Sequence, residues 1–321
     1  MSRKRIQIAL TDEKYRPLFE AITYFVREHY DFDVTDDKNA DFVFHSTSKY
    51  EVLSYPGVRI FATAEMVSPD FNITDYAIGF DRMTFGDRYL HLPLLRVVIP
   101  SYKCLVQSRP NPAETLSAKT GFCAYVMSNN TDSAPERVLI YDLLSKYRSV
   151  ASGGAWRNNT GGRVSDKLAF QSAHKFVIAF ENTSFPGYMT EKFSEAAASN
   201  AVPIYWGDPE IGRIFNPKAF INCHDFDSLE EVVEHVMRID QDDDLYLKML
   251  GEPWFRDGIQ PPEFTDESIA KFLRNIFDQA PEKAYRRSKG RWTIKYEKSL
   301  KRAFFQPFEQ FLRNLKSRSK R

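Results

Sequence analysis

The sequence predicts an α/β protein built from two Rossmann-like domains and a helical basic tail at the C-terminus. Strand-like and helix-like periodicities alternate along the chain, as they do in parallel sheets with crossover helices. The alternation restarts after a stretch rich in Pro, Ser and Thr at 99–121. The 321 residues, 43% of them apolar, suffice for two separate cores. We therefore predict domains over 1–117 and 118–285 and a tail over 286–321.

In the first domain, apolar runs predict strands, and the stretch 12–30 has the spacing of an amphipathic helix. The strands are expected at 5–10, 40–46, 58–65 and 75–81. The stretch 99–121 is expected to be the linker to the second domain.

The second domain repeats this pattern without repeating the sequence. Its strands are expected at 122–129, 176–180, 202–207 and 219–226, and its helices at 135–148, 166–175, 190–200 and 228–239. Two such domains facing each other would enclose a cleft, and ligands bind at the carboxyl ends of parallel strands.

The cysteines and the N-terminus indicate a reducing compartment. Cys104, Cys123 and Cys223 are far apart and form no CxxC pair, which argues against a disulfide framework or a structural zinc site. The N-terminus lacks the apolar core of a signal peptide, and no stretch has the length that a membrane span needs. We therefore expect a cytoplasmic protein.

Several familiar ligand motifs do not occur in the sequence. Without GxGxxG or GxxxxGK[ST], a dinucleotide-dependent oxidoreductase and a P-loop NTPase are both disfavoured. The six His residues have no metal-ligand spacing, so no metal site is expected. An Asp-x-Asp motif in the stretch 240–246 lies between two helical patterns and is interpreted as an acidic interhelix loop.

The segment FENTSFPGYMTEKF, from Phe180 to Phe193, carries more polar residues than a strand-to-helix turn requires. It follows a buried strand, where an open α/β sheet binds its ligand. Thr190 is the expected N-cap, which places Glu191 and Lys192 in the first helical turn. Lys192 is unfavourable there for the helix alone, and a bound phosphate would explain it. Glu191 is also explained by helix-dipole chemistry alone.

A nucleotide site without glycine-rich loops must take its positive charge from side chains. Arg137, at the start of the helix 135–148, and Arg157, in the stretch SGGAWRNN, are candidates. From the residues alone, ordinary surface cations are more common than nucleotide ligands. In this plainer interpretation Arg137 is a solvated helix residue and Arg157 is a loop cation.

A long block of the second domain resembles the signature of the family 10 α-1,3-fucosyltransferases. It reads FVIAFENTSFPGYMTEKFSEAAASNAVPIYWGDPEIGRIFNPKAFINCHDF and matches the family's F-E-N, Y-x-T-E-K, P-I-Y-W-G and F-N-P-x-x-F-I-N elements in order and spacing. SGGAWRNNTGGRV and the segment 62–94 resemble further family blocks, so the match covers most of 58–225. The resemblance implies a GT-B fold, with two domains facing across a cleft, and inverting transfer of L-fucose from GDP-fucose.

The resemblance also implies roles for individual residues. Arg137 and Lys192 match the cations that hold the pyrophosphate, where charge grows as the sugar bond breaks. Glu191 would lie near the fucose and stabilise its oxocarbenium-like transition state. The other donor-binding candidates are Asn182, Tyr188, Glu181 and Arg157.

Glu65 matches the family's general base, which takes the proton of the acceptor hydroxyl. The family typically has Gly-Glu-Asn at this position, whereas this chain has Ala64-Glu65-Met66. The carboxylate is retained and the Asn beside it is replaced. Without the flanking match, an ordinary strand-end carboxylate would be the preferred interpretation.

The tail carries 13 Lys and Arg residues against Glu297 and Glu309, a local charge of +11 in a chain of net charge +1. Pro307 is expected to break or kink its helix, so that the continuous part begins near this residue. A basic helix with an apolar face predicts contact with an anionic membrane surface. Docking on the body is the alternative, and nucleic acid is disfavoured. The residues of the expected apolar face are Phe304, Phe308, Phe311, Leu312 and Leu315.

The leading hypothesis is a GDP-fucose-dependent transferase that makes an α-1,3 linkage to an N-acetyllactosamine-like glycan, in lipopolysaccharide or surface-glycan fucosylation at the inner face of the membrane. No cofactor is expected, and no divalent metal is required. The alternatives are a GT-B transferase that uses another sugar nucleotide, and a catalytically silent relative that binds glycan or membrane, which only Met66 favours. Arg82, Arg88 and Tyr89 are candidates either for acceptor contacts or for bracing the first domain.

Overall fold

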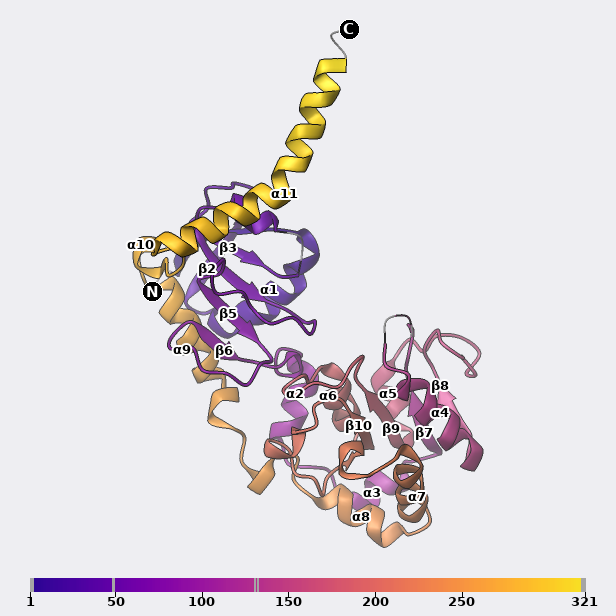
Figure 1. Ribbon diagram of the computed structural model, residues 1–321. Coiled ribbons are helices and arrows are strands. Elements are labelled where there is room, and N and C mark those ends of the chain that lie inside the picture. The colour runs from indigo at the N-terminus through magenta and orange to yellow at the C-terminus, as the bar shows by residue number, and fades with distance from the viewer. Residues whose placement is uncertain (1–2, 48–49, 130, 132, 319–321) are drawn as a thin grey trace. The chain divides into compact units, whose positions relative to one another are not determined.

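The computed structural model describes residues 3–47, 50–129, 131 and 133–318, with side chains as far as residue 305. The chain divides into two compact units, each built around a parallel sheet (Figure 1). Unit 1 consists of Met1–Gly79, Met83–Leu92 and Asp266–Arg321, and unit 2 of Phe80–Arg82 and Pro93–Thr265. The change of unit thus falls after Leu92 rather than at 117/118, and the chain returns to unit 1 at Asp266, ahead of the predicted tail.

The sheet of unit 1 has the strand order β2-β1-β3-β4-β5-β6, and all of its pairs are parallel. Its strands are β1 (Lys4–Leu10), β2 (Tyr30–Thr35), β3 (Phe42–His45), β4 (Val58–Ala62), β5 (Tyr76–Gly79) and β6 (Tyr89–His91). The central strands β3, β4 and β5 are buried along their whole length, which is why their sequences are mostly apolar, with the buried Arg59 of β4 and His45 of β3 as exceptions.

The helix predicted over 12–30 is shorter in the structure. Its α-helical part, α1, spans Arg16–Thr23 between two 3-10 turns. Tyr30 instead begins the edge strand β2, where it pairs with Lys4 of β1. The prediction was wrong here because pairing along the sheet edge outweighs the helical spacing of the apolar residues.

The C-terminal helices of unit 1 are α9 (Asp266–Phe277), α10 (Pro281–Ala284) and α11 (Arg291–Arg318) (Figure 1). α11 is continuous through Pro307, so the start predicted near that residue is wrong. Its first turns are anchored on unit 1, because the buried Arg59 donates a 2.9 Å hydrogen bond to Glu297 and Leu300 packs against the core. The stabilisation from this docking outweighs the cost of the backbone hydrogen bond that Pro307 cannot donate within the helix.

The sheet of unit 2 is also parallel, with the order β11-β10-β9-β7-β8. Its strands are β7 (Gly121–Tyr125), β8 (Val150–Ser152), β9 (His174–Phe180), β10 (Val202–Trp206) and β11 (Ile221–Asn222). This is a doubly wound order whose direction reverses between β7 and β9, and ligands bind at such a switch point. The two predicted Rossmann-like domains are therefore confirmed.

The stretch 99–121, expected to be a linker, is largely helical. Asn111 caps α3 by accepting from the N–H of Ala113, and Pro112 suits the first helical position. The helices of unit 2 are α2 (Ile99–Val106), α3 (Pro112–Ser117), α4 (Glu136–Tyr147), α5 (Lys167–Ser172), α6 (Glu191–Ala198), α7 (Leu229–Asp240) and α8 (Asp243–Gly251).

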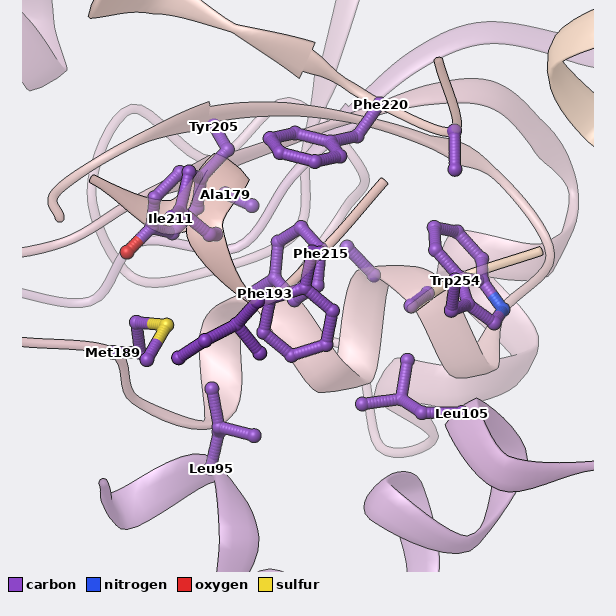
Figure 2. Packing of buried hydrophobic residues seen from close by; sticks show 14 of the residues in the cluster. Leu95, Leu105, Ala179, Met189, Phe193, Tyr205, Ile211, Phe215, Phe220 and Trp254 are labelled. Carbon is purple, nitrogen blue, oxygen red and sulfur yellow. The ribbon is translucent and has the colours of Figure 1, made fainter. Parts of the chain in front are cut away.

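The core of unit 2 anchors α6, the helix that follows the polar segment. Phe193, fully buried in the first turn of α6, lies among Phe215, Phe220 and Trp254 with ring centroids 4.6 to 6.2 Å from its own (Figure 2). Because Phe193 directly follows Lys192, this packing fixes the position of the helix start on which the predicted site depends.

Candidate functional site

Two helices of unit 2 begin at the switch point of its sheet. α4 follows β7 and α6 follows β9, and these strands are neighbours, so both helix starts lie at the same carboxyl edge. Neither helix has a side-chain hydrogen bond from its N-cap residue. The first-turn N–H groups of the helices therefore suit an anionic ligand.

Glu181 is fully buried directly after β9 and organises the start of α6. Its carboxylate accepts one hydrogen bond from the N–H of Thr190 at 2.7 Å and another from the Thr190 hydroxyl at 2.5 Å. Thr190 thus occupies the predicted N-cap position, but its hydroxyl binds Glu181 instead of capping the helix. Burial raises the pKa of Glu181 and outweighs the opposing effects of Lys192 and Thr190.

Lys192 lies between two carboxylates in the first turn of α6. Its Nζ is 3.2 Å from Glu181 Oε2 and 3.1 Å from Glu191 Oε1. Burial alone would lower the pKa of Lys192, but the two carboxylates raise it above its ordinary value. Burial would likewise raise the pKa of Glu191, but Lys192 holds it below its usual range. Both groups are therefore charged at neutral pH, and Glu191 remains about a third exposed.

Arg137, in the first turn of α4, is a buried cation with no acidic partner in the described part of the chain. The residue is only 5% exposed, and its Nη1 donates a hydrogen bond to Asn182 Oδ1 at 2.8 Å. Its Nε is buried without a hydrogen-bond partner, and among the described residues no carboxylate forms an ion pair with it. Since an unpaired buried charge is costly, the geometry suits a bound anion.

Arg137 and Lys192 approach the same strand end. Both charges act on the buried phenol of Tyr125, the last residue of β7, where they oppose the rise in its pKa that burial causes. The carbonyl of Asn182 also accepts from the N–H of Ala134 at 2.9 Å, which ties the end of β9 to the entry of α4. The structure thus brings together Arg137, Asn182, Glu191 and Lys192, as the sequence predicted.

Tyr188 is buried in the segment that leads into α6. Its ring meets the edge of Phe80 with centroids 5.5 Å apart, and its carbonyl accepts from the Tyr205 hydroxyl at 3.3 Å. The turn before it requires Gly187, which has a φ of +88° and where a Cβ atom would lie 2.2 Å from the Phe80 carbonyl oxygen. The Pro-Gly turn therefore sets the path of the segment into α6.

Arg157 does not join the hydrogen-bonded cluster around Lys192. It forms an ion pair with Asp142 of α4, and its guanidinium lies 4.6 Å from the centre of the Trp156 ring. Its side chain is 46% exposed. The structure thus agrees with the plainer interpretation, a loop cation, although the contact with Asp142 holds it against the helix that carries Arg137.

Glu65 belongs to unit 1, in the turn that follows β4. The Thr63 hydroxyl accepts from the N–H of Glu65 at 2.9 Å, and the N–H of Val67 donates to the Glu65 carbonyl at 2.8 Å. Glu65 is exposed, and Met66 beside it is 41% exposed. The turn is therefore held through the backbone groups of Glu65, and its carboxylate is available to a ligand.

Arg88 and Tyr89 brace unit 1. Arg88 donates to the carbonyls of Thr74 at 2.7 Å and Asp75 at 2.8 Å, and Tyr89 is only 8% exposed. The sequence alone left open whether these residues contact the acceptor, and their hydrogen bonds favour the bracing role.

Sequence reasoning missed an ion pair that fixes the loop after β10. Arg82 binds the fully buried carboxylate of Asp208 and also lies 2.9 Å from Glu210. The loop lies tightly against the site, because a Cβ atom on Gly207 would come within 2.4 Å of Glu181 Cγ. The sequence feature that could have indicated this ion pair is Asp208, which directly follows Gly207 at the end of β10. It lies at the same edge of the sheet as Glu181.

The acidic residues of the stretch 240–246 form ion pairs and a helix cap at the junction of α7 and α8. Asp240 binds Arg148 and Lys175, and Asp242 caps α8 by accepting from the N–H of Leu245. In the described part of the chain, no group of three or more His, Cys, Asp or Glu residues could hold a metal ion. No helix within the described ranges is long and apolar enough to span a membrane.

Comparison with known proteins connects this site to a family. The sequence profile described as Glycosyltransferase family 10 (fucosyltransferase) C-term matches residues 116–275, and that of the Alpha-(1,3)-fucosyltransferase FucT N-terminal domain matches 10–98. A crystal structure of α1,3-fucosyltransferase with GDP-fucose is 30% identical and has 92% of its chain covered. The chain belongs to glycosyltransferase family 10.

The solved relatives of this family 10 protein also define its fold. The structure with GDP-fucose superposes with a TM-score of 0.74 over 87% of this chain. HepE of Anabaena with UDP-glucose superposes with a TM-score of 0.55 at 9% identity, which is a likeness of fold alone. The predicted GT-B fold is confirmed.

Curated family 10 relatives are longer than this chain. Alpha-(1,3)-fucosyltransferase FucT of Helicobacter pylori is 35% identical over 277 residues, which is 75% of this chain and 58% of the relative. The bovine 3-galactosyl-N-acetylglucosaminide 4-alpha-L-fucosyltransferase FUT3 is 35% identical over 161 residues, 48% of this chain and 42% of the relative. The chain thus spans less than two thirds of the length of either.

Proposed function

We propose that this family 10 protein transfers L-fucose from GDP-fucose to a hydroxyl group of an acceptor glycan, with inversion and most readily in α-1,3 linkage. The observation that carries the proposal is Arg137, a buried cation that has no acidic partner among the described residues and lies beside the uncapped start of α6. The pyrophosphate of a sugar nucleotide supplies the anion that this arrangement lacks. The solved relative with GDP-fucose supports fucose as the transferred sugar.

Arg137 and Lys192 would bind the diphosphate, whose negative charge grows as the bond to fucose breaks. Because both cations are fixed before the reaction, they need no rearrangement as the charge develops. Glu191, an ionised carboxylate next to Lys192, would stabilise positive charge on the sugar ring. Asn182 orients Arg137 through their 2.8 Å hydrogen bond.

Glu181 and Tyr188 would act by positioning rather than by direct contact with the donor. Glu181 is fully buried with its oxygens bonded to Thr190 and Lys192, and Tyr188 is 4% exposed. Glu181 holds Lys192, and Tyr188 supports the turn that leads into α6. Arg157 would assist only through α4, where it binds Asp142.

Inverting transfer requires a base for the proton of the acceptor hydroxyl. Glu65 is the proposed base, since it is an exposed carboxylate at the carboxyl end of β4. Glu65→Gln should abolish transfer and leave GDP affinity unchanged, because Glu65 and the GDP-binding residues belong to different units. Glu51→Gln, at another exposed carboxylate of unit 1, is the matched control and should retain both.

The experiment that tests the proposal is GDP release from GDP-fucose in EDTA, with and without N-acetyllactosamine. Release that depends on the acceptor supports the transferase, its donor and its independence of divalent metal together. No release, with GDP binding still detected by calorimetry, would direct the search to another acceptor or another sugar nucleotide. Competition between GDP-fucose and other GDP-sugars then separates the donors.

The acceptor is proposed to be an N-acetyllactosamine-like unit of lipopolysaccharide or another surface glycan. The galactosyl-N-acetylglucosaminide in the name of the bovine relative supports this class of acceptor. Transfer assays on galactose, N-acetylglucosamine and N-acetyllactosamine, with methylation analysis of the product, test both the acceptor and the linkage.

We also propose that the tail holds the protein at an anionic membrane surface, on the cytoplasmic face. The local charge of +11 over 286–321 supports this, as does Trp292, which is 74% exposed with Lys295 Nζ 4.6 Å from its ring. The side chains of Phe308, Phe311, Leu312 and Leu315 lie outside the described residues. Flotation with phosphatidylglycerol vesicles, compared with phosphatidylcholine vesicles, is the test. Equal binding to both vesicles, or to neither, would contradict the proposal.

A further inference from the structure

Unit 1 contains a cavity of about 270 Å³ at the carboxyl edge of its sheet. The cavity begins beyond the ends of β3 and β4, next to the turn that carries Glu65, because Val67 of the same turn lines it. The other lining residues on which the inference depends are His45, Tyr50, Asp70 and Thr74.

These walls combine an aromatic ring with hydroxyl, imidazole and carboxylate groups. Sites for small ligands place a few polar groups among apolar ones in this way, and those for drug-sized ligands have about 300–1,000 Å³, so this cavity suits a smaller ligand such as one sugar ring. His45 Nε2 lies 2.8 Å from Thr74 Oγ1. Burial, with the charges of Arg59 and Arg287, lowers the pKa of His45 to about 3, so the ring is neutral at physiological pH. His45 thus adds no positive charge to the cavity, and the hydroxyl groups and the Asp70 carboxylate of the walls suit the hydroxyl groups of an uncharged sugar ring.

The C-terminal helix α11 holds two of the lining residues. The ring of Phe304 stacks on Tyr50 with centroids 3.7 Å apart, and the hydroxyl of Tyr296 donates to Asp70 Oδ2 at 2.9 Å. Leu300 lies one turn from each of these residues on the same stripe of the helix. It packs against the core cluster that includes Val52, which also lines the cavity.

We propose that this cavity binds one neutral sugar ring of the acceptor glycan and that α11, through Phe304 and Tyr296, determines its affinity. The identity of the glycan rests on the proposed function. The cavity lies on the unit that carries the proposed base, in the turn region of Glu65, so a sugar bound in it would belong to the acceptor rather than to the donor. The helix of the basic tail would thus take part in acceptor recognition.

The test compares the full-length chain with Phe304→Ala, Phe304→Leu and Tyr296→Phe. Loss of the aromatic stack should raise the acceptor KM about 3- to 10-fold, and loss of the Tyr296 hydroxyl should raise it about 3-fold. The KM for GDP-fucose and the kcat should stay unchanged in all three. Ile294→Ala, a matched variant at another exposed position of α11, should leave every parameter unchanged.

Direct sugar binding separates this inference from the proposed function. Saturation-transfer NMR with galactose, N-acetylglucosamine and N-acetyllactosamine should give ligand signals with the wild-type chain that weaken in both Phe304 variants. Calorimetric GDP binding and thermal unfolding confirm that each variant is folded.

Unchanged acceptor KM and unchanged sugar signals in the variants would overturn the inference while leaving the transferase intact. If the wild-type chain transfers no fucose, the proposed function fails, and sugar signals that depend on Phe304 would still support the cavity as a saccharide site. A wild-type chain that gives no signal with any of the sugars would overturn the inference on its own.

Discussion

The guanidinium of Arg137 donates a 2.8 Å hydrogen bond to the side-chain oxygen of Asn182, 45 positions later in the chain. The bond joins the first turn of α4 to the end of β9, across the switch point of the sheet. Because Asn182 offers a neutral oxygen and not a carboxylate, it orients Arg137 without neutralising its charge. That charge is then available to a diphosphate.

Arg137→Ala is expected to weaken GDP binding about 10- to 100-fold, the loss that hydrogen bonds to a charged group imply. Arg137→Lys should recover only part of the affinity, because a lysine cannot reproduce the planar fork of donors. Calorimetric titration with GDP measures both. Arg213→Ala, at a side chain 66% exposed in the same unit, is the control and should bind GDP as the wild type does. Unchanged affinity in Arg137→Ala would exclude Arg137 from the donor site.

The two glutamates beside Lys192 should respond differently to substitution by Gln. Glu181 is fully buried and bonded to Thr190, so Glu181→Gln should lower the free energy of unfolding by about 3 kcal/mol. Glu191 is partly exposed, so Glu191→Gln should change stability by less than about 1 kcal/mol and reduce fucose transfer instead. Urea unfolding and transfer rates separate the two. Equal losses of stability would contradict the assignment of Glu181 to positioning and Glu191 to chemistry.

Glu297 should make the stability of unit 1 depend on pH. Burial would raise its pKa, but Arg59, Ser288 and Lys301 outweigh that effect and lower it to about 2, against 4.5 for an ordinary Glu. Because the folded value lies below the unfolded one, the stabilisation is complete above about pH 4.5 and is lost as the pH falls towards 2.

Between pH 6 and pH 3.5 this one group should account for about 1.4 kcal/mol of lost stability. Urea unfolding of the wild type and of Glu297→Gln at both pH values isolates the effect, because the other carboxylates are common to both proteins. Glu282→Gln, at an exposed position of α10, should retain the wild-type dependence. A Glu297→Gln variant as sensitive to acid as the wild type would refute the prediction.

The cysteines should differ in reactivity. Cys104 is partly exposed on α2, whereas Cys123 and Cys223 are buried, and burial raises the pKa of both of these thiols. The native protein should therefore take up one equivalent of maleimide at Cys104, and unfolding in urea should release the other two thiols. Mass spectrometry of the labelled peptides distinguishes this pattern from one in which a buried thiol reacts first.

Local sequence patterns predicted eight of the eleven strands in the described part of the chain, missing β2, β6 and β8, and they grouped the proposed donor residues in one region. β9 contains the continuous apolar run 176–180, and β4 is apolar except for the buried Arg59, because both faces of these parallel strands are buried. Asn182, Glu191 and Lys192 could be placed together because they lie within one short connection between a strand and a helix. Arg137 joined them because its helix follows the strand adjacent to β9.

Patterns were insufficient where packing between distant segments decides the outcome. Tyr30 fits a helical spacing but pairs with β1, and the helices α2 and α3 form in a Pro-rich stretch expected to be a linker. The role of Glu181 could not be predicted from the sequence either. Besides a cation, its carboxylate binds the backbone N–H and the hydroxyl of Thr190, and no sequence pattern indicates such contacts.

The sequence by itself determined the fold class, the family and the short segment that carries most of the proposed donor-binding residues, since periodicity and motif order are local properties of the chain. Only the tertiary structure decided that Arg137 has no acidic partner within the described ranges and that Arg157 has one in Asp142. It alone showed that α11 begins ahead of Pro307 and contacts Tyr50. The physical reason is that the energy of a buried charge or an aromatic contact depends on which groups from distant segments surround it.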